Sequence, residues 1–154
     1  MLYGLLSFLL AFVLLFALAY IVLARRSTGL PEVVVSFGDT HIRVELAVSM
    51  LAKARGLAYR DGLADGHGML FTFGSASRRS FWMKGMRFPI DMVWLRDGAV
   101  VDVTSHVDPQ IGSVAGQLRT YAPSEPADEV LELPAGYATT HNIVVGSRMS
   151  VTQD

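Results

Sequence analysis

The stretch RRSFWMKGMRFPIDMVWL, residues 78–95, contains both tryptophans of the chain together with four cations and one aspartate. Aromatic and β-branched residues at 81–83 and 90–95 are typical of strands, and Pro89 separates the two runs. The stretch therefore predicts two short strands around a proline turn. Its charged side chains raise the question of whether it also forms a functional site.

Strand alternation assigns each residue of this stretch to a face, because neighbouring side chains point to opposite sides of a sheet. In the first run, Phe81 and Met83 share one face, and Trp82 and Lys84 share the other. The second run divides in the same way into two sets, which are Ile90, Met92 and Trp94 on one face and Asp91, Val93 and Leu95 on the other. We expect one face of each strand to belong to the core.

The charged residues of the stretch leave two interpretations open. In the first, a polar ligand stacks on an indole and is oriented by charges in a cleft formed by Trp82, Lys84, Arg87 and Asp91. In the second, Asp91 accepts backbone N–H groups, or pairs with Lys84 or Arg60, and closes the proline turn. An isolated buried carboxylate costs several kcal/mol, so both interpretations require a partner for it. The second, structural interpretation is favoured.

Turn and cap signals divide the rest of the chain into short elements. Gly38 and Gly98 mark two hairpins, and Ser49 is placed to cap a short helix that Gly56 ends. Strands are expected at 33–37, 41–46, 69–73, 99–104, 130–133 and 149–151, a helical turn at 137–142, and at most one strand near 118–121 within a long loop at 105–126. This pattern predicts a mainly β or α+β domain, compact and barrel-like or sandwich-like, with one short helix.

The N-terminal residues 1–24 carry no charged side chain, and their apolar run exceeds the roughly 20 residues that a helix needs to cross a bilayer. We predict a transmembrane helix here that acts as a signal anchor, followed by a linker at 25–31 and a globular domain at 32–154. The lipid bilayer is then a partner through residues 1–24, and the protein is a single-pass component of the cell membrane.

Two features of the N-terminal segment leave its processing and orientation open. Ala17-Leu18-Ala19 imitates the cleavage site of a signal peptide, although the basic region that normally precedes such a peptide is missing. Arg25 and Arg26 follow the apolar run and favour a cytoplasmic domain by the positive-inside rule. Two charges do not decide the side of the membrane.

Charge and cysteine content exclude several classes of function. The formal net charge is −1 at pH 7, so no long-range field gathers nucleic acid, and no nucleic-acid partner is expected. The chain has no cysteine, which excludes disulfides, thiolate metal sites and a cysteine nucleophile. His67, His106 and His141 lie in predicted loops without metal-ligand spacing, so neither a metal nor a cofactor is expected.

Five motifs occur in the order and spacing of a known family. They are GLAYR at 56–60, GMLF at 68–71, FWMK at 81–84, PID at 89–91 and VLELPAG at 130–136. The chain resembles the DUF192 family, small prokaryotic domains of unknown function that often follow a signal peptide or membrane anchor. The resemblance covers roughly 33–151 and implies a compact, mostly β fold with no catalytic residue to assign. The chain departs from the family at Gly85 and Met86, where asparagine and threonine are usual, and at Gly146-Ser147, where Gly-Asp is usual.

Binding, rather than catalysis, is the function expected from these observations. A membrane-tethered, envelope-associated domain is predicted to bind a small polar ligand or a protein partner, and the candidate binding residues are Arg60, Trp82, Lys84, Arg87 and Asp91. The alternative is a hydrolytic enzyme in which Asp91 is the acid/base and Lys84 or Arg60 is its electrostatic partner.

Overall fold

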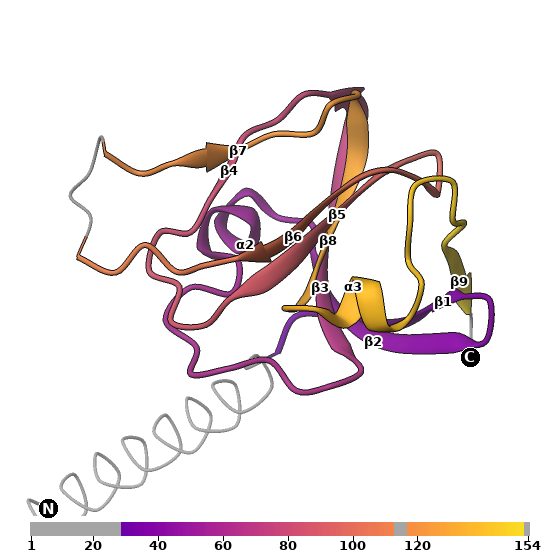
Figure 1. The fold of residues 1–154 in the computed structure, drawn as a ribbon, viewed down its shortest axis with the longest axis horizontal. Coiled ribbons are helices and arrows are strands. Elements are labelled where there is room, and N and C mark those ends of the chain that lie inside the picture. Colours follow the sequence, from indigo (N-terminus) through magenta and orange to yellow (C-terminus); the bar gives the residue numbers. More distant parts are fainter. Residues whose placement is uncertain (1–28, 113–116, 153–154) are drawn as a thin grey trace, which may run out of the picture.

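The structure is a computed structural model, which describes residues 29–112 and 117–152. It shows a mostly β domain built on one large mixed sheet with one short helix beside it (Figure 1), so the predicted β-rich domain is confirmed. The strands of the large sheet follow in the spatial order β6 (Ala99–Val107), β5 (Ile90–Arg96), β8 (Ala127–Pro134), β3 (His67–Ser77), β2 (Thr40–Ala47), β1 (Glu32–Phe37) and β9 (Ser150–Thr152).

A two-stranded sheet and two helical segments accompany the large sheet in the described part of the chain. β4 (Phe81–Trp82) pairs with β7 (Thr120–Tyr121), the short helix is α2 (Met50–Arg55), and α3 (Tyr137–Thr140) is a single turn. The strand predicted near 118–121 is thus β7, which joins the long loop to the FWMK motif.

Local signals act as the sequence predicts. The Oγ of Ser49 accepts a hydrogen bond from the N–H of Ala52 at 3.1 Å and begins α2, and Gly56, with a φ of 51°, ends it. Gly38 and Gly98 turn the two predicted hairpins with φ angles of 57° and 71°, which glycine adopts without steric cost.

Connection length explains the one change of strand direction in the sheet. β2 and β3 run parallel, and α2 lies in the crossover between them, whereas the other strand pairs of the large sheet are antiparallel. A parallel pair needs such a long connection, while antiparallel pairs are joined by short turns.

The two edges of the large sheet are bridged by the segment that leads into β9. The N–H of Val100 donates to the carbonyl of Ser147 at 2.9 Å, and the N–H of Met149 donates to the carbonyl of Gly98 at 2.8 Å. Because β9 also pairs with β1 at the far edge, the sheet curls around its concave side.

Apolar side chains cover both faces of the sheet, so the domain has two cores. The inner core, on the side of α3, includes Val35, Ile42, Val44, Leu70, Val93, Leu95, Leu131 and Leu133. The outer core, on the side of α2 and β4, includes Met69, Phe71, Met83, Met92, Trp94 and Val130.

The alternation predicted for β5 is confirmed, since its residues divide between the inner and outer cores. β5 has one face in a core, as expected, and its other face belongs to a core as well. Each of its first six residues is fully buried, because the strand lies between β6 and β8 with apolar cores on both sides. A strand that is buried on both faces has no solvated side, so apolar and polar residues do not alternate along it.

The predicted transmembrane helix at residues 1–24 lies outside the described residues. Within residues 29–112 and 117–152, no helix has the length and hydrophobicity to span a membrane.

Candidate functional site

Asp91 is held by backbone N–H groups on the inner face of β5. It is fully buried, its Oδ1 accepts hydrogen bonds from the N–H of His106 at 2.8 Å and of Gly136 at 3.0 Å, and its Oδ2 accepts one from the N–H of Ala138 at 3.0 Å. These bonds fasten β5 to β6 and to the start of α3. Asp91 therefore does not share a cleft with Trp82, which lies on the opposite side of the sheet, and the structural interpretation of this aspartate holds.

A second buried carboxyl group, that of Glu132, lies on the outer face. Glu132 alternates in β8 with Leu131 and Leu133, which belong to the inner core, so its side chain projects to the side of α2 and β4. Its neighbours across the sheet are Met69 in β3 and Met92 in β5, both fully buried. A carboxyl group thus occurs in the middle of an otherwise apolar surface.

Glu132 has little polar compensation for its burial. The residue is 5 % exposed, and its Oε2 is buried without a hydrogen-bond partner among the described residues. Burial raises the pKa of Glu132 to about 8, against a smaller opposing effect of the Arg60 charge. The group is therefore mainly protonated at neutral pH, and an unpaired buried polar group of this kind requires an explanation.

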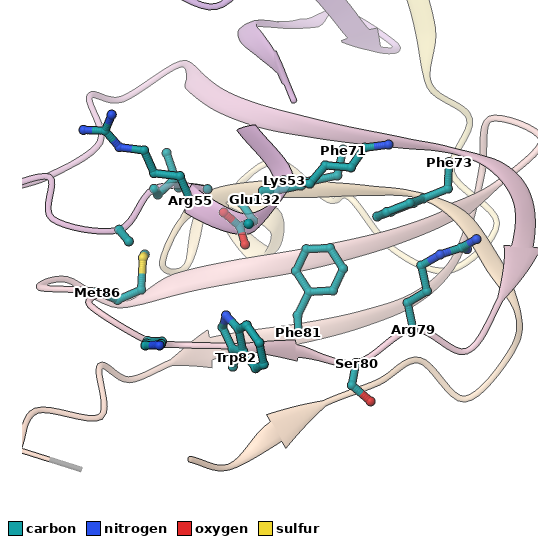
Figure 2. Close-up of a pocket in the computed structure, with 15 residues that line it drawn as sticks. Lys53, Arg55, Phe71, Phe73, Arg79, Ser80, Phe81, Trp82, Met86 and Glu132 are labelled. Atoms are coloured by element: carbon teal, nitrogen blue, oxygen red, sulfur yellow. The ribbon is translucent and has the colours of Figure 1, made fainter. Parts of the chain in front are cut away.

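The carboxyl group of Glu132 faces a pocket of about 410 Å³ between α2 and β4 (Figure 2). The segment after α2 contributes one wall with Leu57 and Ala58, and β3 and β4 contribute aromatic rings from Phe71, Phe73, Phe81 and Trp82. Figure 2 shows Glu132 pointing into the space between the α2 side and the Phe81 and Trp82 side chains. The volume lies within the range of sites for small organic molecules.

The aromatic wall is preorganised by edge-to-face contacts around Phe81. Its ring lies 5.1 Å from that of Phe71, 6.3 Å from that of Phe73 and 5.4 Å from that of Trp94, each close to perpendicular. Trp94 is held in turn by a hydrogen bond from its Nε1 to the Oγ1 of Thr104 at 2.9 Å. Such pairs restrict the rings to one arrangement, so the wall is formed before any ligand arrives.

Four cations line the same pocket: Lys53, Arg55, Arg79 and Lys84. Two of them lie over the ring of Phe73, at 4.6 Å for the Nζ of Lys53 and 4.3 Å for the guanidinium of Arg79. Glu132 is the one acidic residue among the lining residues. The pocket therefore combines an apolar interior with a positively charged border.

Arg60 approaches Glu132 but is engaged by another glutamate. Its Nη1 and Nη2 donate to the two carboxylate oxygens of Glu45 at 2.5 and 2.8 Å, and this hydrogen bonding lowers the pKa of Glu45 and raises that of Arg60. The bidentate pair leaves Glu132 without an ion-pair partner among the described residues. Two glutamates on the same face of the sheet thus have different charge states at neutral pH.

The predicted site residues do not assemble as a group. Trp82 and Lys84 line the pocket, and Arg60 lies close enough to influence Glu132. Arg87 instead forms an exposed ion pair with Asp61 at 2.6 Å. The predicted convergence of four residues, including Asp91, on one cleft is therefore corrected: two of them belong to the pocket.

Glu132 is the residue that the sequence interpretation missed, although VLELPAG was recognised as a motif. The available signal was a charged residue inside the apolar run Val130–Leu133, which lies in a strand too apolar to be half-solvated. Burying this side chain without a hydrogen bond costs free energy, which predicts that Glu132 bonds either to a partner in the protein or to a ligand.

Two other kinds of site have less support in the described part of the chain. No group of three or more histidine, aspartate or glutamate side chains there is arranged to hold a metal ion. A polar hollow of about 420 Å³ lies between β6 and β7, beside a loop in which the side chain of Gln110 hydrogen-bonds both backbone groups of Arg119. Because the side-chain amide of Gln110 already has its hydrogen-bond partners, this hollow is the weaker candidate for a binding site.

The chain belongs to the DUF192 family, described as "Uncharacterized ACR", whose profile matches residues 33–151. A solved structure from Sinorhizobium meliloti 1021, described as a "putative transcription regulator", is similar with 28 % identity and a TM-score of 0.71 over 81 % of this chain and 97 % of that one. A protein of unknown function from Novosphingobium aromaticivorans DSM 12444 is similar with 26 % identity and a TM-score of 0.71 over 80 % and 88 %. No curated protein matches the chain.

Proposed function

We propose that this domain binds a small organic ligand in the pocket between α2 and β4, with the body of the ligand against the aromatic wall and one polar group hydrogen-bonded to Glu132. The observation that carries the proposal is the buried, unpartnered Oε2 of Glu132 facing a cavity of about 410 Å³. A protonated carboxyl group both donates and accepts a hydrogen bond, so one polar group of a ligand satisfies it.

The chemistry of the walls supports a ligand over a single structural water. One water needs two to four polar partners, and Glu132 is the sole acid in a lining dominated by aromatic and aliphatic groups. A ligand with an apolar body covers the rings of Phe81 and Trp82 and reaches the carboxyl group at the same time. Sites of this composition typically bury most of a small ligand.

Trp82 offers a direct readout of binding, because it lines the pocket and is 53 % exposed, whereas Trp94 is fully buried. A ligand that covers Trp82 is expected to shift its fluorescence to shorter wavelength or quench it during a screen of small aromatic and aliphatic compounds. The Trp82→Phe variant, which retains Trp94, is the control and is expected to show a smaller response.

Glu132→Leu tests the polar contact without opening a cavity. The variant keeps the shape of the buried side chain approximately, and it is expected to bind the screened ligands at least about tenfold more weakly because the hydrogen bond is lost. Full affinity in this variant, or an undiminished fluorescence response in Trp82→Phe, would contradict the proposed site.

A hydrolytic role through Asp91, the alternative from the sequence, has little support in the geometry. The carboxylate of Asp91 is surrounded by three backbone donors on the inner face, away from Lys84 and from the pocket. A general acid or base must reach the substrate proton. We therefore propose a binding domain, and turnover of a ligand found in the screen would overturn this choice.

Attachment to a membrane through residues 1–24 is part of the proposal and is supported by their uncharged apolar sequence. The domain follows after a short connection, since the carbonyl of Pro31 already accepts a hydrogen bond from the N–H of Leu46 at 2.7 Å. Fractionation of cells is expected to place the chain of residues 1–154 with the membranes. A chain without residues 1–24 is expected to separate from the membranes. A reporter fused to the C-terminus identifies the side of the membrane on which the domain lies.

A further inference from the structure

We infer that the ligand of this pocket is an amphipathic anion, whose apolar body lies against the aromatic wall and whose anionic group lies beside Arg55 and Lys84. The inference rests on the proposed function and adds the chemical class of the ligand. It follows from the distribution of charge around the pocket.

The first step is the balance of charge among the lining residues. Lys53, Arg55, Arg79 and Lys84 are cations, and Glu132 is the only lining acid. Glu132 does not balance them, since burial keeps its carboxyl group mainly protonated at neutral pH. The pocket thus carries a local positive charge in a domain whose chain has a formal net charge of only −1.

The second step is to ask which of these cations are free to bind an anion. Arg79 donates to the carbonyls of Ser75 at 2.8 Å and Ala127 at 3.3 Å and lies over Phe73, and Lys53 lies over the same ring. Arg55 and Lys84 are exposed and form no ion pair among the described residues. They are therefore the lining cations that no acid among the described residues engages.

The third step is the contrast with nearby cations outside the pocket. Arg60 is paired with Glu45, and Arg87 is paired with Asp61. Where these cations lie, the chain supplies a carboxylate, and beside Arg55 and Lys84 it supplies none among the described residues. An anionic group of a ligand would take the place of the missing carboxylate, because charge-assisted hydrogen bonds to arginine and lysine are stronger than those between neutral groups.

The fourth step is selectivity. A cationic ligand of the same shape meets four like charges and no ionised acid, so repulsion opposes its binding. A neutral ligand keeps the apolar contacts and the hydrogen bond to Glu132 but gains nothing from Arg55 and Lys84. The predicted order of affinity is anion first, neutral analogue second and cation last.

The test uses two fluorescent probes with the same aromatic body. The full-length chain in lipid nanodiscs is titrated at low salt with 8-anilinonaphthalene-1-sulfonate and with N-phenyl-1-naphthylamine, which lacks the sulfonate. Empty nanodiscs provide the blank, and a quenching of tryptophan fluorescence that weakens in Glu132→Leu identifies binding at the pocket. The sulfonate is expected to bind about fivefold to tenfold more tightly than the neutral probe, a ratio that falls as salt is added.

The variant Arg55→Met/Lys84→Met is expected to abolish this preference, so that the ratio of the two affinities falls to about one. The matched control is Arg78→Met/Arg96→Met, which removes two exposed cations that do not line the pocket and is expected to retain the preference. Equal binding of both probes to the wild type, or a preference that survives loss of Arg55 and Lys84, overturns the inference alone. Failure of both probes to quench Trp82 counts against the proposed function itself.

Discussion

Asp91 and Glu132 are two buried acids on adjacent strands that reach opposite outcomes. Asp91 of β5 pairs in register with Leu133 of β8, one residue from Glu132, and strand alternation sends the two carboxyl groups to opposite faces. On the inner face Asp91 meets three backbone N–H groups, and on the outer face Glu132 meets apolar side chains and a cavity. One acid is structural, and the other is available for binding.

Glu132 is expected to make the stability of the protein depend on pH. Its pKa is about 8 in the folded protein against an ordinary value of 4.5. The folded state therefore retains a proton that the unfolded chain releases, so the free energy of unfolding falls as the pH rises from about 4.5 to about 8, by up to about 1.4 kcal/mol per unit. Glu132→Gln removes this contribution and is expected to be more stable than the wild type at pH 8.

Urea denaturation at pH 5, 6.5 and 8 measures this effect as a difference between wild type and Glu132→Gln. The advantage of the variant is expected to grow by a few kcal/mol from the lowest to the highest pH. Because all other titrating groups are common to both proteins, the difference isolates Glu132. A constant difference across the three values would show that the carboxyl group has its ordinary pKa.

Asp91→Asn is expected to lower the free energy of unfolding by about 3 kcal/mol. The Asp91 carboxylate accepts hydrogen bonds from the N–H groups of His106, Gly136 and Ala138. In the variant, the NH₂ group of the asparagine faces at least one of these donors and cannot accept its hydrogen bond. Chemical denaturation measures the loss, and probe binding by the folded fraction is expected to stay unchanged. Asp61→Asn, which alters an exposed ion pair, is the control and is expected to change stability little.

At the scale of elements, turn and cap residues made the strands and α2 predictable from sequence. Gly38, Gly98 and Ser49 act through their immediate neighbours, so their effect is visible in the chain itself. The burial of both faces of β5 was not predictable, because it depends on β8, which pairs with it from a distant position in the chain. The same limit hid Glu132, whose environment is assembled from α2, β3 and β4.

α2 is an element whose stability depends on its caps. The helix has six residues and buries none of them, and isolated helices of this length are marginal in water. Ser49→Ala removes the bond to the N–H of Ala52 and is expected to weaken the helix by about 1 kcal/mol. Hydrogen exchange is expected to accelerate for the amides of α2 and to remain unchanged for those of β8. Uniform exchange behaviour in both elements would contradict this local role.

The backbone of the turn after FWMK favours glycine at residue 85. Gly85 has a φ of 72°, and a Cβ there would lie 2.9 Å from the ring of Tyr59, whose N–H donates to the Gly85 carbonyl at 2.8 Å. Gly85→Ala is therefore expected to lower the free energy of unfolding by about 1 to 2 kcal/mol.

Removal of the Tyr59 ring separates the two causes of this loss. Tyr59→Ala in the Gly85→Ala background is expected to relieve the steric contact and leave the backbone strain, so part of the stability returns. Gly62→Ala is the control, because Gly62 has no positive φ and no atom near its Cβ position. Thermal unfolding of the four proteins measures each contribution, and an unchanged melting temperature for Gly85→Ala would refute the strain.

For the whole molecule, the sheet separates the inner core from the face that carries the proposed binding pocket. Its inner face encloses a core that the segment before β9 closes, and its outer face carries the second core and the pocket (Figure 1). The sequence predicted the β-rich domain and two of the pocket residues, Trp82 and Lys84. It did not predict the pocket, because the lining comes from α2, β3, β4 and β8, whose order in space differs from their order in the chain.

The central claim is that the pocket at Glu132 holds a ligand, and a crystal structure of the complex with 8-anilinonaphthalene-1-sulfonate tests it most directly. We predict the probe between α2 and β4, with its rings against Phe81 and Trp82 and its sulfonate beside Arg55 and Lys84. Probe bound elsewhere on the domain, with the pocket containing only solvent, would contradict the account.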